Sequence, residues 1–173
     1  MTEDELTGHI IITGSRQAGI SSFVSQKAED FEAYDEEGMG IDIQTTNVTL
    51  DDGKECHLHF YEIAGTFPLD SLRKIIRKKT VGLAIMFDLN NTVSLELAEV
   101  LFKQIQDKLH KNTPTNKFLL GSHSDLERKV EQKHVDAVLT IMGEDTHYLE
   151  FSAKTGDNLL ESLEKIARVV LNL

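Results

Sequence analysis

The chain has 173 residues, of which 40% are hydrophobic, so it fits one domain and can bury a core. Its formal net charge of -11, from 29 acidic and 18 basic residues, disfavours nucleic acid as a partner. One cysteine, Cys56, excludes an internal disulfide framework, and no apolar run reaches the roughly 18 residues that span a bilayer.

The first part of the chain predicts a strand, a glycine-rich loop and a helix. The opening MTEDEL is acidic and lacks a signal-peptide pattern and a myristoylation glycine, so we expect a cytoplasmic protein. HIIIT (9–13) is typical of a buried strand, and GSRQAGIS (14–21) has the glycine spacing of a phosphate-binding loop. ISSFVSQKAED (20–30) predicts a helix.

Two runs of alternating apolar and polar residues, 41–50 and 55–63, predict a β-hairpin with its turn at Asp52-Gly53. The alternation slips near Asn47, which indicates a bulge. His57 and His59 share one strand face at a spacing that suits a metal ion. Because no third ligand is evident, we favour a solvated strand face there.

The rest of the chain alternates buried strands with helices. Strands are predicted at 81–87, 117–121 and 148–151, and helices from Asn91 or Thr92, near 130–142 and from about Thr155. The first of these helices should bury Leu97, Leu101, Phe102, Ile105 and Leu109, and the last should bury Leu159, Leu160, Leu163, Ala167 and Val170. The chain ends at Leu173 without a prenylation cysteine, so we expect no membrane anchor in it.

This alternation predicts an α/β fold over 1–173: a six-stranded, mostly parallel sheet with helices on both faces and one antiparallel edge strand. Ligands of such sheets bind at the carboxyl ends of the strands. The glycine loop, EIAG (62–65), GSHSD (121–125) and FSAK (151–154) all fall at that edge. We therefore predict one site there.

The order of these segments resembles the Ras superfamily of small GTPases, nearest to its Rab-like members, over nearly the whole chain. The resemblance implies a P-loop fold that binds GTP or GDP with Mg²⁺. In the loop pattern G-x-x-x-x-G-K-[ST] the lysine is replaced by Ile20, a loss that should weaken nucleotide binding by about 2–5 kcal/mol. Arg16 stands where active members usually have glycine and could lend a charge or crowd the γ-phosphate. The residues that still match the nucleotide-binding loop are Gly14, Gly19, Ser21 and the adjoining Ser22. The alternative is a plain turn whose glycines serve only the connection.

The Mg²⁺ site implied by the resemblance is incomplete. Ser21 supplies the expected hydroxyl, but Gly38 stands at the position of the switch threonine that completes the metal shell. Glu62 replaces the aspartate that holds Mg²⁺ through water, which keeps the charge on a longer arm. Ser21 and Glu62 are therefore the candidate metal ligands.

The hydrolytic residues implied by the resemblance are also altered. Gly65 matches the glycine whose amide meets the γ-phosphate, but Thr66 replaces the glutamine that orients water. Residues 29–37 contain six acids, which repel a triphosphate if they lie near it. We expect no efficient hydrolysis and assign no catalytic residue.

The guanine-binding motifs match the family pattern better than the metal-binding and hydrolytic positions do. The pattern N-K-x-D is SHSD here, with Asp125 retained for the guanine donors and Ser122 and His123 in place of asparagine and lysine. His123 could stack on the base. The motif SAK is complete at Ser152, Ala153 and Lys154. The alternative role for Asp125 is a helix N-cap.

Two functions remain open at this point. The leading one is a pseudoenzyme: a protein-interaction module, by analogy a subunit or adaptor of a trafficking, ciliary or motor complex, with weak or absent guanine-nucleotide binding. The other is an atypical nucleotide switch with slow hydrolysis. Partners should bind the switch-equivalent loops and the basic segment Arg73–Lys79, whose alternative role is an exposed helix face. A phosphoacceptor receiver domain is excluded because no acceptor aspartate follows the third strand.

Overall fold

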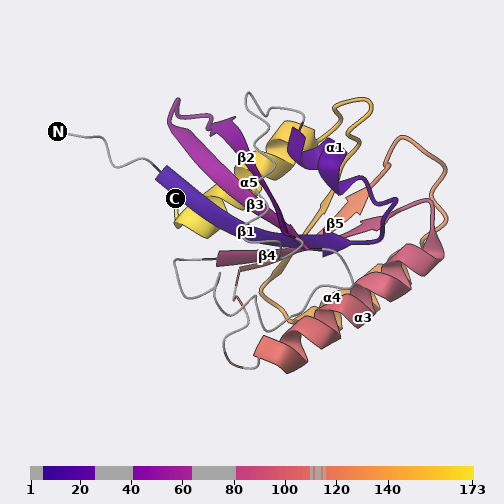
Figure 1. Cartoon of the computed structure of the whole chain (residues 1–173). Helices are drawn as coiled ribbons and strands as arrows, with labels where there is room; N and C mark the ends of the chain where they lie inside the picture. The colour runs from indigo at the N-terminus through magenta and orange to yellow at the C-terminus, as the bar shows by residue number, and fades with distance from the viewer. Residues whose placement is uncertain (1–5, 26–40, 64–80, 110, 112–113, 115) are drawn as a thin grey trace.

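A computed structural model describes residues 6–25, 41–63, 81–109, 111, 114 and 116–173 (Figure 1). Within these residues, six strands form one sheet in the order β2-β3-β1-β4-β5-β6. The strands are β1 (Leu6–Gly14), β2 (Ile41–Thr49), β3 (Glu55–Ile63), β4 (Val81–Asp88), β5 (Asn116–Ser122) and β6 (Thr146–Glu150). The helices are α1 (Ile20–Ser25), α3 (Thr92–Leu109), α4 (Gln132–Met142) and α5 (Leu159–Leu171). The predicted α/β fold is confirmed.

All neighbouring strands run parallel except β2 and β3, which form the antiparallel hairpin at one edge. The carboxyl ends of the parallel strands therefore meet at a single edge of the sheet. The loops after β1, β4 and β5 leave the sheet there, and so does the loop after β6. This is the arrangement that the sequence predicted for the site.

Helices cover both faces of the sheet, and each face has its own core (Figure 1). Ile10 and Ile12 of β1 pack in the core beneath α1 and α5, whereas Ile11 packs in the core beneath α3 and α4. All three side chains are fully buried. The uninterrupted apolar run in β1 is thus required because the strand is buried on both sides.

The bulge predicted near Asn47 is wrong. The register between β2 and β3 is continuous from the pair Ile41 and Ile63 to the pair Thr49 and Glu55. The alternation slips because β2 changes the face on which it buries apolar side chains. Its first residues, Ile41 and Ile43, pack toward α3 and α4, and its last buried residue, Val48, packs toward α5.

Two residues of the predicted helix stripes are exposed instead of buried. Leu97 on α3 is 39% exposed and Leu160 on α5 is 47% exposed. The buried stripe of α3 starts from Ser94 and Leu95, so Leu97 lies beside that stripe rather than in it. α5 begins at Leu159, later than the expected start at Thr155, because Gly156 and Asn158 have positive φ angles that no helix contains. No helix in the described part of the chain is long and apolar enough to cross a membrane.

Candidate functional site

The phosphate-type loop joins β1 to α1, and both of its glycines have a structural reason to be there. A Cβ atom on Gly14 would lie 2.3 Å from the carbonyl oxygen of Met86, because β1 and β4 are in close contact at this point. Gly19 has a φ of +82°, which side chains rarely adopt. Between them, the amide of Ala18 donates to the carbonyl of Ser15 at 3.0 Å and closes a turn.

Ile20 takes the place of the loop lysine, and its side chain is only 7% exposed. It belongs to the core cluster beneath α1, together with Phe23 and Phe151. Arg16, Ser21 and Ser22 are exposed. The loop thus keeps its backbone turn and its hydroxyl groups, but a core residue stands where a phosphate-binding charge is needed.

Glu62, the candidate Mg²⁺ ligand near the end of β3, lies in an unfavourable setting for a carboxylate. It is partly buried and pairs directly across the hairpin with Asp42 of β2. Burial and, secondarily, the negative charge of Asp42 raise the pKa of Glu62 above its ordinary value. The two facing carboxyl groups repel each other, so this setting disfavours a negative charge on Glu62.

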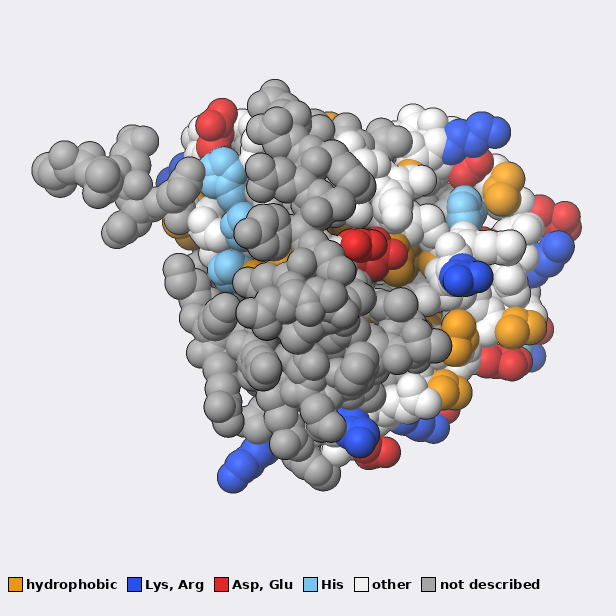
Figure 2. All heavy atoms as spheres, in the orientation of Figure 1, with side chains coloured by type: hydrophobic (Ala, Val, Ile, Leu, Met, Phe, Trp, Pro, Cys, Tyr) orange, Lys and Arg blue, Asp and Glu red, His pale blue; other side chains and the backbone are white. Residues whose placement is uncertain are grey.

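At the second possible metal site, the Nδ1 atoms of His57 and His59 form hydrogen bonds with side chains of the neighbouring strand β2. His57 Nδ1 lies 2.6 Å from Asn47 Oδ1, and His59 Nδ1 lies 2.8 Å from the hydroxyl of Thr45. The ring of His59 also stacks on His9 of β1, with ring centroids 5.2 Å apart. Figure 2 shows histidine side chains gathered on this part of the surface. Among the described residues, no group of three or more His, Cys, Asp or Glu could hold a metal ion.

The guanine-side residues form an ordered group. The hydroxyl of Ser152 donates to Asp125 Oδ1 at 2.6 Å and accepts the amide of Thr155 at 3.2 Å. The bond from Ser152, helped by the charge of Lys154, lowers the pKa of Asp125 below its ordinary value. Asp125 is exposed and ionised, which suits recognition of the N1 and N2 donors of guanine. Its alternative role as an N-cap is wrong, since α4 begins only at Gln132.

His123 connects the guanine side to the phosphate-type loop. Its Nδ1 lies 3.1 Å from Asp88 Oδ1 at the end of β4, and its Nε2 would be 3.8 Å from a Cβ atom on Gly19. Its φ of +59° is unusual for a residue with a side chain. The neighbouring Ser122 is buried, and its hydroxyl donates to the carbonyl of Phe87 at 3.0 Å. Ser122 and His123, which replace the asparagine and lysine of the family motif, therefore still brace the loop through their contacts with Phe87 and Asp88.

Asp88 was missed by the sequence interpretation. The only signal for it was its position, directly after a continuous apolar strand that ends at the site edge.

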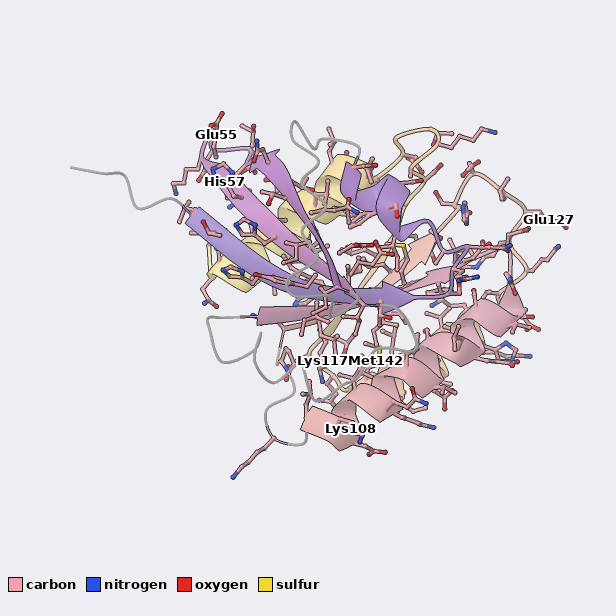
Figure 3. The ribbon with its side chains drawn as sticks, in the orientation of Figure 1. Glu55, His57, Lys108, Lys117, Glu127 and Met142 are labelled. Carbon is pink, nitrogen blue, oxygen red and sulfur yellow. The ribbon has the colours of Figure 1, made fainter. Side chains whose placement is uncertain are left out.

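Figure 3 shows the two ends of the sheet: Glu127 follows the guanine-binding segment at one end, and Glu55 and His57 mark the hairpin at the other. The remaining site positions, Gly38, Gly65 and Thr66, and the segments 29–37 and 73–79 lie outside the described residues. Ala153 is partly buried against the core cluster, and Lys154 is exposed.

A family model described as "Ras family" matches residues 9–172 of the chain. The chain belongs to the Ras family. This family in general binds guanine nucleotides with Mg²⁺.

Individual Ras-family relatives are distant. Ras-related protein rab-39 of Caenorhabditis elegans is 24% identical, with 94% of this chain and 72% of that protein covered. Ras-related protein Rab-13 of Bos taurus is 24% identical, with 94% and 79% covered. The Ras and EF-hand domain-containing protein homolog of Mus musculus is 24% identical over 93% of this chain. The chain spans only 26% of that mouse protein.

Proposed function

We propose that this Ras-family chain acts as a protein-interaction module with weak guanine-nucleotide binding and no efficient GTP hydrolysis. The observation that carries the proposal is Ile20, which is 7% exposed and belongs to the core cluster at the position of the phosphate-binding lysine. Loss of one partner of a desolvated charge pair weakens binding by about 2–5 kcal/mol, or about 30- to 4,000-fold.

The metal side supports the same proposal. Glu62 pairs across the hairpin with Asp42, and burial and that neighbouring charge raise its pKa, so the structure disfavours the ionised form that Mg²⁺ would bind. At the sequence level, Gly38 lacks the switch hydroxyl and Thr66 is too short to orient water as glutamine does. Each of these changes acts on the triphosphate end of the ligand, where hydrolysis would take place.

A second function, an atypical nucleotide switch with a long-lived GTP state, is favoured by one observation. The hydroxyl of Ser152 donates to Asp125 Oδ1 at 2.6 Å and holds the carboxylate that would recognise the base. Whatever nucleotide binds should therefore contain guanine. The two proposed functions differ in the affinity for the nucleotide and share the same binding position.

Partners and location follow from the proposal. The switch-equivalent loops and the basic segment 73–79 are the surfaces that we expect proteins to contact, since a cluster of Lys and Arg contrasts with the chain's net charge of -11. We place the protein in the cytoplasm, with a role in a trafficking, ciliary or motor complex as the analogy to Rab-like proteins suggests.

The nucleotide content of the protein as purified tests the proposal. We expect no stoichiometric GDP or GTP after denaturation and chromatography, and no multiple-turnover release of phosphate above the buffer background. Stoichiometric GDP in the purified protein would favour the switch function. Phosphate release that disappears in Ser21→Ala would overturn the absence of hydrolysis.

A further inference from the structure

His123 lies between the end of β4 and the phosphate-type loop. Its Nδ1 is 3.1 Å from Asp88 Oδ1, and its Nε2 is 3.8 Å from the place that a Cβ atom on Gly19 would take. The side chain is 33% exposed, so a ligand at this edge of the sheet can contact it. The ring therefore faces a carboxylate with one nitrogen and the phosphate-type loop with the other.

Asp88 fixes which nitrogen of His123 carries a proton. Its side chain is 13% exposed, and its Oδ1 also accepts the amide of Asn90 at 2.8 Å. A carboxylate only accepts hydrogen bonds, so Nδ1 of His123 donates to it and keeps its proton. Nε2 on the far side of the ring then carries a proton only when the ring is charged.

The charge state of the ring decides what Nε2 offers to the phosphate-type loop. In the neutral ring Nε2 presents a lone pair, which phosphate oxygens do not bind because they are acceptors too. In the charged ring it presents an N–H on a cation, and such hydrogen bonds are about twice as strong as neutral ones. At the lysine position of the loop, Ile20 is 7% exposed and carries no charge.

We propose that protonated His123 supplies the positive charge that Ile20 does not, so that guanine-nucleotide binding tightens as the pH falls. This inference rests on the proposed function, because it concerns the same nucleotide site. A ligand that binds the charged ring more tightly must, by linkage, bind more tightly at the lower pH. Histidine ordinarily takes up its second proton near pH 6.5, so the change in affinity should fall between about pH 8 and about pH 6.

The charged groups around the imidazole ring act on its protonation in opposite directions. Asp125 favours the charged ring: its pKa is lowered first by the hydroxyl of Ser152 and, among smaller causes, by the charges of Lys154 and of the imidazole. Lys154 opposes protonation, and Arg16, exposed on the phosphate-type loop, acts in the same direction. The first turn of α3 contains no acidic residue. Asp88 favours the charged ring from the shortest of these distances, 3.1 Å, and therefore has the largest influence.

Binding of GDP at two pH values tests the proposal with the full chain. The variant is His123→Asn, because asparagine tolerates the φ of +59° at this position and stays neutral. GDP itself gains a proton near about pH 6, so parent and variant are compared at the same pH. We expect the parent to bind GDP about tenfold more tightly than the variant at pH 6, and equally at pH 8. Guanosine, which has no phosphate, should show no such gain at pH 6.

Two further measurements separate the possible failures. His134→Asn, an exposed histidine on α4, should bind GDP like the parent at both pH values. Nitrogen NMR of the ring without ligand should find the proton on Nδ1 at pH 8 in the parent, and this preference should be lost in Asp88→Ala. Equal GDP binding by parent and folded His123→Asn at pH 6, or the same gain with guanosine, would overturn the inference alone. Absence of GDP binding by the parent at both pH values would overturn the weak nucleotide binding of the proposed function as well.

Discussion

Ile20 and Asp125 both lie at the carboxyl edge of the sheet, and they have opposite consequences for the proposed nucleotide site. Ile20 contributes its side chain to the core, where it stabilises α1 on the sheet and leaves the phosphate side without its lysine charge. Asp125 is exposed and oriented by the hydroxyl of Ser152. At the scale of single residues, the base side of the site is therefore more complete than the phosphate side.

Replacing Asp125 should remove the preference for guanine. Hydrogen bonds to a charged group contribute about 1.5–3 kcal/mol, so Asp125→Ala should weaken GDP about 10- to 150-fold and leave ADP unchanged. Competition between GDP and ADP for the protein at millimolar concentrations measures this directly. Glu127→Ala, an exposed acid in the same segment, is the control. Unchanged GDP affinity in Asp125→Ala would show that the carboxylate does not read the base.

Glu62 should make the stability of the protein fall as pH rises. Its pKa is raised in the folded state by burial and by Asp42, so the unfolded chain releases the proton first. Stability is therefore fully present below its ordinary pKa of 4.5 and is lost as pH rises through the folded value. Glu62→Gln should melt at a higher temperature than the parent near pH 7, and the difference should vanish near pH 4. The control is Glu55→Gln on the same strand, and equal melting of Glu62→Gln and parent near pH 7 would contradict the account.

At the scale of elements, the close contact of β1 with β4 limits what can replace the first loop glycine. A Cβ atom on Gly14 would lie 2.3 Å from a backbone oxygen of Met86, which cannot rotate away. Gly14→Ala should therefore cost about 2–3 kcal/mol or more in the free energy of unfolding, measured by denaturant titration. Gly53→Ala has a strained φ of +82° but nothing within 4 Å, so it should cost only about 1 kcal/mol. A smaller loss at Gly14 than at Gly53 would mean that the strands adjust freely.

The elements themselves were largely predictable from the sequence, because continuous apolar runs and alternation report directly on burial. The sheet edge that forms the site was predictable for the same reason. The buried faces of the helices were less predictable. Leu97 and Leu160 lie next to the buried stripes of their helices, and periodicity alone does not show whether a residue at the border of a stripe is buried or exposed. The prediction of a bulge at Asn47 was wrong because β2 changes the face on which it buries apolar side chains, and this change also breaks the alternation.

Contacts within the site could not be predicted from motif positions. The pattern identified Asp125, Ser152 and His123, but not the hydrogen bond between the first two or the contact of His123 with Asp88. These depend on loop conformation, including the positive φ of His123. The family motifs have other side chains at these positions, so their partners cannot simply be transferred.

At the scale of the whole molecule, the chain has the Ras-family fold, and a buried isoleucine stands at the position of the phosphate-loop lysine. Each face of the sheet has its own core, and Ile20 is part of one of them. The net charge of -11 also opposes a polyanionic ligand unless local cations offset it.

Calorimetric titration of GDP into Ile20→Lys, beside the parent and at fixed salt and Mg²⁺, tests the central claim most directly. The lysine restores the missing charge on a backbone frame that Gly14 and Gly19 preserve, so we predict binding about 30- to 4,000-fold tighter than the parent. The variant should also melt at a lower temperature without nucleotide, because a core isoleucine is lost. The same change with Arg16→Gly shows whether the arginine obstructs the loop. If both variants stay folded and bind GDP no more tightly than the parent, the loop is a structural turn and not a weakened phosphate site.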